Sequence, residues 1–209
     1  MLCKMGKRFI YVIAAIWCAV GVCGAATASA GEDWLGDLSR TMRGRYGVIF
    51  TMQAEGMEPA EGYYAVDGEA YYLTLGVSEV YGDGRLRYEI NNERKEVTED
   101  RVDTKSFDML NNPTRAFDFV ETEFTSSVEQ VADGRAVIEL LPKKSGSALS
   151  RIRISVRRTG RGVEPERVDY DFDGDRITLL MRSIDFGGHI EVRRWNRQAY
   201  RAYEMISFL

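Results

Sequence analysis

One stretch of the chain has the residue types and spacing of a metal-binding loop. Residues 169–174 read DYDFDG, which matches the first half of a calcium loop whose alternating carboxylates supply oxygen ligands. The twelfth position of such a loop requires a bidentate glutamate, and here it is Leu180. A second interpretation is a strand with Val168, Tyr170 and Phe172 on one side, ended by an Asp-Gly turn. We favour the strand because the loop pattern is incomplete, and calcium binding is the alternative.

Few other side chains have the chemistry of a catalyst. His189 is the only histidine, and it follows two glycines in an expected turn. A zinc site of the usual kind needs further His or Cys ligands, and the cysteines all lie within the first 23 residues. Lys144 and Ser145 could form a Ser/Lys pair, but they stand in a polar stretch typical of a flexible loop. We therefore predict that the protein is not an enzyme and has no cofactor.

Arginines gather in one further stretch of the chain. The first three alternate with apolar residues, which is typical of the solvated face of a strand. A docking surface for a partner is the alternative interpretation. The arginines are Arg151, Arg153, Arg157, Arg158 and Arg161.

The elements that must position these side chains are mostly strands. Asp-Gly pairs stand at four places between runs that alternate apolar and polar residues, and this dipeptide favours the two-residue turn of a β-hairpin. We predict about ten to twelve strands in an unclosed antiparallel β-barrel, a curled meander with short helices covering its apolar face. The Asp-Gly pairs begin at Asp67, Asp83, Asp133 and Asp173, and the last two predicted strands are Ile190–Trp195 and Tyr203–Phe208.

Two stretches are predicted to be helical. Apolar residues from Trp34 to Tyr46 recur at close to helical spacing, which indicates an amphipathic first helix. Between Asp103 and Phe119 the alternation stops, and Phe107 and Leu110 have the spacing of one face of a short helix. Pro113 ends or restarts that helix, because it lacks a backbone donor and disfavours helical backbone at the preceding residue.

The first 30 residues have the pattern of a secretory signal peptide. Lys4, Lys7 and Arg8 precede an uncharged apolar stretch from Phe9 to Ala26, and small residues lead to an expected cut before Gly31. An uncleaved membrane anchor is the alternative. We predict one domain over residues 31–209 and a periplasmic location after cleavage.

The charge of the mature chain bears on its partners. Cleavage would leave 179 residues without cysteine and would lower the net charge from −4 to −7. An acidic chain argues against nucleic acid as a partner, because phosphate backbones attract basic surfaces. The inward faces are expected to be rich in Tyr, Leu, Ile and Phe, so we predict a monomeric binding protein with apolar ligands.

Several segments follow one another in a characteristic order: residues 62–66 (GYYAV), 79–88 (EVYGDGRLRY), 96–98 (EVT), the pair Asn112-Pro113 and residues 203–206 (YEMI). Their order and spacing, after an amphipathic first helix, resemble the outer-membrane lipoprotein carrier family, LolA. The resemblance covers nearly the whole mature chain. It departs from the family in the turn after the second strand, where well-known members carry Arg-Pro and this chain has Asp67-Gly68-Glu69.

The resemblance implies a periplasmic carrier that holds the acyl chains of lipoproteins in an apolar cavity and moves them towards the outer membrane. Its partners would be lipidated proteins or lipid, together with inner-membrane release machinery. The alternative is a lipid- or lipopeptide-binding sensor, a regulatory module of the same fold. The residues predicted to line the cavity are Leu73, Leu86, Tyr88, Ile90, Phe107, Leu110 and Phe117.

Overall fold

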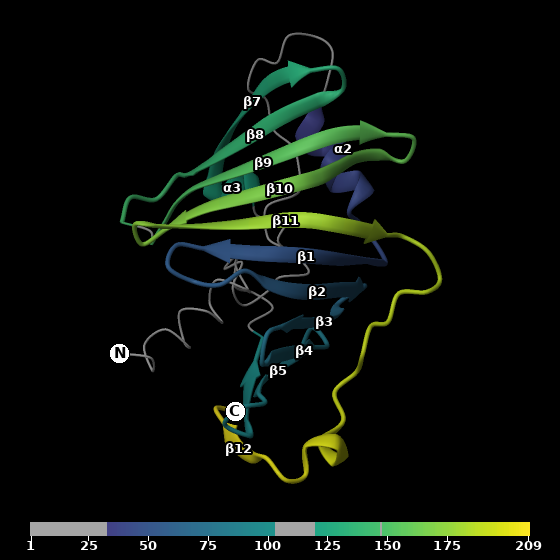
Figure 1. Ribbon diagram of the computed structural model, residues 1–209, viewed down its shortest axis with the longest axis vertical. Coiled ribbons are helices and arrows are strands. Elements are labelled where there is room, and N and C mark those ends of the chain that lie inside the picture. The colour runs from purple at the N-terminus through teal and green to yellow at the C-terminus, as the bar shows by residue number, and fades with distance from the viewer. Residues whose placement is uncertain (1–32, 103–119, 147) are drawn as a thin grey trace.

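The computed structural model describes residues 33–102, 120–146 and 148–209, and its strands form one twelve-stranded sheet (Figure 1). The strands lie in the order β12-β6-β5-β4-β3-β2-β1-β11-β10-β9-β8-β7. Their bounds are β1 Tyr46–Ala54, β2 Ala60–Asp67, β3 Ala70–Leu75, β4 Ser78–Gly82, β5 Leu86–Asn91, β6 Glu96–Arg101, β7 Phe124–Ala132, β8 Arg135–Pro142, β9 Leu149–Thr159, β10 Gly162–Phe172, β11 Asp175–Asp185 and β12 Glu204–Ser207.

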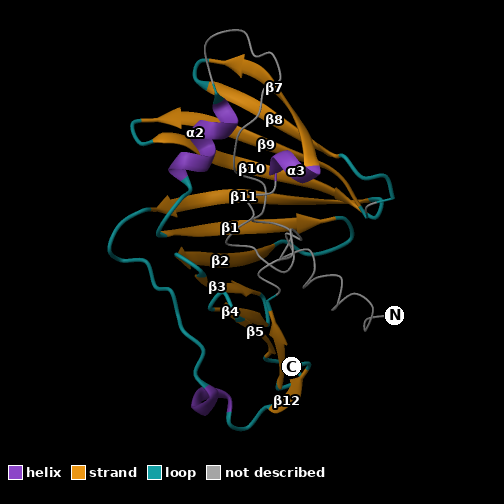
Figure 2. Cartoon of the chain, turned by 180° about the vertical axis from the view of Figure 1, so that it is seen from behind, coloured by secondary structure: helices purple, strands orange, loops and turns teal. Residues whose placement is uncertain are grey.

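The sheet is open, with β12 and β7 at its two edges. All neighbouring strands run antiparallel except β12, which pairs in parallel with β6. The sheet curls so that one face is concave, and helices α2 and α3 lie on that side (Figure 2). The short 3-10 helix η2 (Arg197–Tyr200) belongs to the chain after β11 and packs on the opposite face. The prediction of a mainly β, unclosed antiparallel sheet with short helices over its apolar face is confirmed.

The Asp-Gly pairs mark hairpin turns, but not all in the same geometry. Asp133 and Asp173 have positive φ together with their glycines, as a type I′ turn requires. Asp67 instead ends β2, and Gly68 alone has positive φ at the first position of the turn. Asp83 lies in a longer loop, where its side chain accepts hydrogen bonds from the backbone N–H groups of Arg85 and Leu86.

Helix α2 (Trp34–Thr41) lies across the concave face and packs on β8 and β10. Its N-cap Asp33 accepts a hydrogen bond from the backbone of Gly36, which satisfies one donor of the first turn. The apolar periodicity predicted a helix reaching Tyr46, but Tyr46 begins β1. The second described helix, α3 (Val120–Glu123), leads directly into β7.

Polar contacts fix α2 to the sheet. Arg158 of β9 places Nη1 3.0 Å from the Asp37 carboxylate, and its guanidinium carbon lies 4.4 Å from the centre of the Trp34 ring. The Thr41 hydroxyl accepts a hydrogen bond from the backbone N–H of Val163 at 3.1 Å. The helix is therefore attached by its side chains as well as by its apolar face.

Replacing Arg158 with Ala is expected to lower the free energy of unfolding by about 1 kcal/mol, because a partly exposed ion pair and a cation–π contact are lost together. Urea denaturation followed by circular dichroism measures this change. Arg153→Ala, also on β9 but on its exposed opposite side, is the matched control and should change stability by less than about 0.5 kcal/mol. Equal losses in the two variants would contradict this role of Arg158.

The chain after β11 departs from the prediction. Residues 190–196 contain no strand, although Ile190–Trp195 was predicted to be one, and the last predicted strand is shortened to β12. This stretch contacts the sheet through its side chains, such as Arg193 and Trp195, instead of pairing with a neighbouring strand through backbone hydrogen bonds. The predicted helix near Phe107 and Leu110 and its end at Pro113 lie outside the described residues.

Candidate functional site

The concave face, here called the inner face, carries a large apolar cluster. It includes side chains from strands β1–β4 and β7–β11 and from helices α2 and α3. Many of them are fully buried, including Phe50, Ile138, Ile154 and Leu179. The period-two alternation of each strand produces this surface, because every second residue points to the same side of the sheet.

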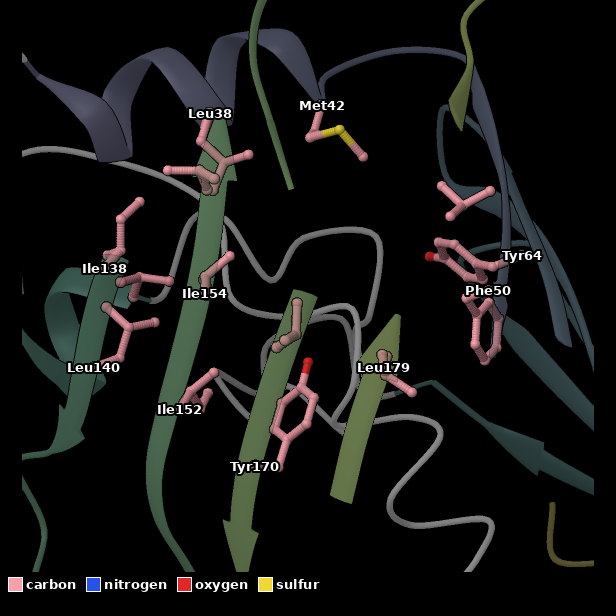
Figure 3. Close-up of a cluster of buried hydrophobic side chains, with 14 of the residues drawn as sticks. Leu38, Met42, Phe50, Tyr64, Ile138, Leu140, Ile152, Ile154, Tyr170 and Leu179 are labelled. Atoms are coloured by element: carbon pink, nitrogen blue, oxygen red, sulfur yellow. The ribbon is translucent and has the colours of Figure 1, made fainter. Parts of the chain in front are cut away.

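The arrangement of this cluster follows the curl of the sheet. Figure 3 shows Leu38 and Met42 of α2 above the side chains of β8 to β11, with Phe50 and Tyr64 directed inwards from the opposite side. Among the described residues, α2 and α3 lie over β7–β10, and no helix lies over the inner side of β1–β4 (Figure 2). The inner face is therefore an apolar surface wider than its described helical cover.

The opposite face, here called the outer face, carries a second and more aromatic cluster on β3 to β6. It is built from Tyr72, Tyr81, Tyr88, Ile90 and Val97. The C-terminal segment, residues 190–209, passes down this side of the sheet and ends beside β6 (Figure 1). Its Trp195 ring stacks on Tyr88 with centroids 4.2 Å apart and on Tyr200 with centroids 5.2 Å apart. The C-terminal segment thus covers the outer apolar cluster.

The Glu79 carboxylate is one of the groups that join this segment to the sheet. Glu79 Oε2 accepts hydrogen bonds from Tyr72 at 2.8 Å, Tyr81 at 3.0 Å and Tyr200 at 3.2 Å, and Asn92 donates to Oε1 at 2.9 Å. Burial by itself raises the pKa of Glu79, but these four donors outweigh it and bring the pKa below its usual value. The carboxylate is therefore held ionised where the C-terminal segment meets β3 and β4.

Replacing Glu79 with Gln is expected to speed tryptic cleavage after Arg194 and Arg197 about tenfold, because hydrogen bonds to a charged acceptor become neutral ones and the segment opens more often. Proteolysis followed by mass spectrometry measures the rate. The Glu58→Gln variant, changed in the exposed loop before β2, should be cleaved at the same rate as the unmodified protein. If Glu79→Gln also cleaves at that rate, the carboxylate does not hold the segment.

The structure separates the predicted cavity residues. Leu73 belongs to the inner cluster and is 2% exposed, whereas Leu86, Tyr88 and Ile90 belong to the outer cluster. These four were expected to share one inward face, and they do not. Strand β5 presents its apolar side outwards, because the C-terminal segment covers it there. The other three predicted residues, Phe107, Leu110 and Phe117, lie outside the described residues.

The carboxylates of the calcium-like stretch are engaged by arginines. Asp169 accepts hydrogen bonds from Arg167 and Thr178, and these outweigh burial so that its pKa lies below its usual value. Asp171 accepts from Arg176 and Arg151, which also lower its pKa. The stretch forms the end of β10 and a turn, as the strand interpretation predicted. Within the described ranges, no three His, Cys, Asp or Glu side chains are grouped as metal ligands.

The other candidates for chemistry lie on the surface. His189 and the Lys144-Ser145 pair are exposed in loops. Of the arginine-rich stretch, Arg151 and Arg157 form ion pairs with acidic residues of the neighbouring strands, which is the arrangement expected of a solvated strand face. In the part of the chain that the structure describes, no helix is both long and apolar enough to cross a bilayer.

The fold is similar to several solved structures. An uncharacterized conserved protein from Thermus thermophilus has a TM-score of 0.47 and 7% identity, with 82% of this chain and 94% of that one covered. A putative outer membrane lipoprotein-sorting protein domain from Vibrio parahaemolyticus has a TM-score of 0.37 and 10% identity, with 76% and 92% covered. A LolA superfamily protein from Nitrosomonas europaea has a TM-score of 0.34 and 10% identity, with 78% and 95% covered.

These similarities concern the fold. No protein-family model matches the chain, and no curated protein matches it in sequence. At such low identities, the function of this chain has to be inferred from its own residues.

Proposed function

We propose that the inner face binds acyl chains. The observation that supports this is the extent of the inner apolar cluster, which continues from β8 round to β4 while the described helices lie over β7–β10. A curled sheet of this size buries its apolar face against a second layer, and extended hydrocarbon can supply that layer. Each methylene group taken from water contributes about 0.8 kcal/mol, so an acyl chain can be held firmly without any polar contact.

We further propose that the ligand is a lipoprotein and that the protein carries it through the periplasm towards the outer membrane. The predicted signal peptide and the sequence resemblance to LolA support this role. Lipidated proteins or lipid would then be the cargo, and release machinery in the inner membrane would be the partner that loads it. The carrier would need no catalytic group.

A second candidate is a sensor that binds lipid or lipopeptide and regulates a signalling partner. The turn between β2 and β3 favours this candidate, because it reads Asp67-Gly68-Glu69 and lacks the Arg-Pro that well-known carriers have there. A sensor does not need to release its ligand to an acceptor. Depletion of the protein separates the two candidates, since lipoprotein sorting should fail without a carrier and continue without a sensor.

Native mass spectrometry of protein isolated from the periplasm tests acyl-chain binding directly. We expect mass additions that correspond to lipid or to a lipidated protein and that disappear after delipidation. The delipidated sample, refolded and measured under the same conditions, is the control for the apo mass. Only the apo mass in both samples would overturn the proposal.

A further inference from the structure

Strand β5 directs a pair of charged side chains to the inner face. Val80 of β4 pairs with Leu73 on one side and with Glu89 on the other, so Glu89 lies on the same face as Leu73. Arg87 precedes Glu89 by two residues in the strand and therefore points the same way. The inner face thus changes from apolar on β1–β4 to charged on β5.

This pair is buried. The side chains of Arg87 and Glu89 are 13% and 14% exposed, and Arg87 Nη2 lies 2.8 Å from Glu89 Oε1. That oxygen is inaccessible to solvent and accepts no hydrogen bond of regular geometry, so its contact with Arg87 is electrostatic. Burial raises the pKa of Glu89 above its usual value and Asp100 adds to this rise, although Arg87 lowers it. A buried carboxylate oxygen normally accepts a hydrogen bond, and this one has unused capacity.

We propose that Glu89, with Arg87 beside it, binds the polar head of an acylated ligand whose tails lie on the apolar part of the inner face. The inference rests on the proposed acyl-chain binding. A carboxylate recognises an N–H donor, and a neighbouring guanidinium recognises an oxygen acceptor. The head must therefore carry an N–H group close to an acceptor oxygen. Phosphatidylethanolamine and the N-acylated cysteine of a lipoprotein both have this chemistry.

A competition assay tests the proposal with two matched pairs of probes. Delipidated protein is loaded with pyrene, an apolar dye, which is then displaced. The first pair is dioctanoyl phosphatidylethanolamine and dioctanoyl phosphatidylcholine, which differ in the N–H donors of the headgroup. The second pair is a triacylated cysteine peptide and the same peptide methylated on its amide nitrogen.

We expect unmodified protein to prefer the N–H member of at least one pair by about tenfold, as a hydrogen bond to a charged group predicts. A preference confined to the first pair identifies a lipid headgroup, and one confined to the second identifies a lipoprotein. Equal displacement within both pairs overturns the proposal, and this comparison needs no variant. If the protein fails to take up pyrene and all four probes, the proposed acyl-chain binding fails as well.

Replacement of Glu89 with Gln assigns the preference to this residue. The variant should bind the N–H probes about tenfold more weakly and bind phosphatidylcholine and pyrene as before. Glu93→Gln, in the exposed turn after β5, is the matched control and should retain the preference. If Glu89→Gln does not fold, Glu89→Asp moves the carboxylate back by one methylene and should also reduce the preference. A folded variant that keeps the full preference overturns the role of Glu89.

Discussion

Truncation of Leu73 to Ala is expected to weaken the binding of a hydrocarbon probe about tenfold or more, whereas the same truncation at Leu86 leaves binding unchanged. The two leucines lie on β3 and β5 of one sheet but on opposite faces. Leu→Ala removes about three carbon atoms, or roughly 2 kcal/mol of apolar contact, and an affinity change of this size exceeds tenfold.

Fluorescence titration with pyrene measures both affinities. Leu73 is almost fully buried, so its truncation also costs about 2–5 kcal/mol of stability. The titrations are therefore done at a temperature well below the thermal unfolding midpoint of each variant. Circular dichroism establishes that both variants are folded. Equal weakening by the two substitutions, or weakening by Leu86→Ala alone, would contradict binding on the inner face.

The sequence predicted the two sides of β5 correctly but not which side faces the interior. Leu86, Tyr88 and Ile90 alternate with Arg87 and Glu89, and alternation shows only that the strand has one apolar and one polar side. An apolar side points to the interior unless another part of the chain covers it from outside. That cover is Trp195 and its neighbours, more than 100 residues later in the sequence. No local pattern in β5 contains this information.

The hairpins were predictable because their cause is local. Asp133-Gly134 and Asp173-Gly174 adopt the positive φ angles that this dipeptide permits, and each joins two strands that follow one another in the chain. The parallel pairing of β12 with β6 joins strands about 100 residues apart, and it follows from the path of the C-terminal segment. A closing strand could therefore be predicted near Tyr203, but its partner and direction could not.

Aromatic residues determine the path of the C-terminal segment. Trp195, Tyr200 and Tyr203 stand close together after the last hairpin, and each makes a ring contact within the outer cluster. The strand predicted at Ile190–Trp195 begins with a different pattern, because Ile190 and Val192 alternate with the charged Glu191 and Arg193. In the structure, the Trp195 ring stacks on Tyr88 of the sheet, and Tyr200 stacks on Trp195. A cluster of aromatic residues near a chain end was the available signal for a segment packed on an outer face.

The same cluster makes the fold sensitive to alkali. We expect the free energy of unfolding to fall steeply as the pH rises above about 10, the range in which exposed tyrosines ionise. Burial is the main cause that raises the pKa of Tyr72 and of Tyr88, each to about 12, and the neighbouring Glu79 and Glu99 carboxylates raise them further. Burial also raises the pKa of Tyr81, followed by its hydrogen bond with Tyr200.

The sign of the effect follows from proton binding. Between about pH 10 and pH 12 the folded protein keeps these phenolic protons while the unfolded chain loses them, so a rise in pH favours unfolding. The stabilisation is fully present below about pH 10 and is lost as the pH approaches the folded-state values. Each tyrosine contributes about 1.4 kcal/mol per pH unit, so three of them remove about 4 kcal/mol per unit. Over the two pH units this amounts to about 8 kcal/mol, which is comparable to a typical stability of about 5–15 kcal/mol.

Urea denaturation at about pH 9, 10 and 11 measures this dependence, with tyrosinate absorbance as a second probe of ionisation. Tyr88→Phe keeps the ring that stacks on Trp195 but has no phenolic proton, so it should reduce the slope by about one third. Because Glu79 and Tyr200 join the C-terminal segment to Tyr81, hydrogen exchange in residues 190–209 should rise before exchange in β8 to β11. A stability that stays constant from about pH 9 to 11 would contradict the burial of these phenols, and simultaneous opening of both regions would contradict a separate C-terminal segment.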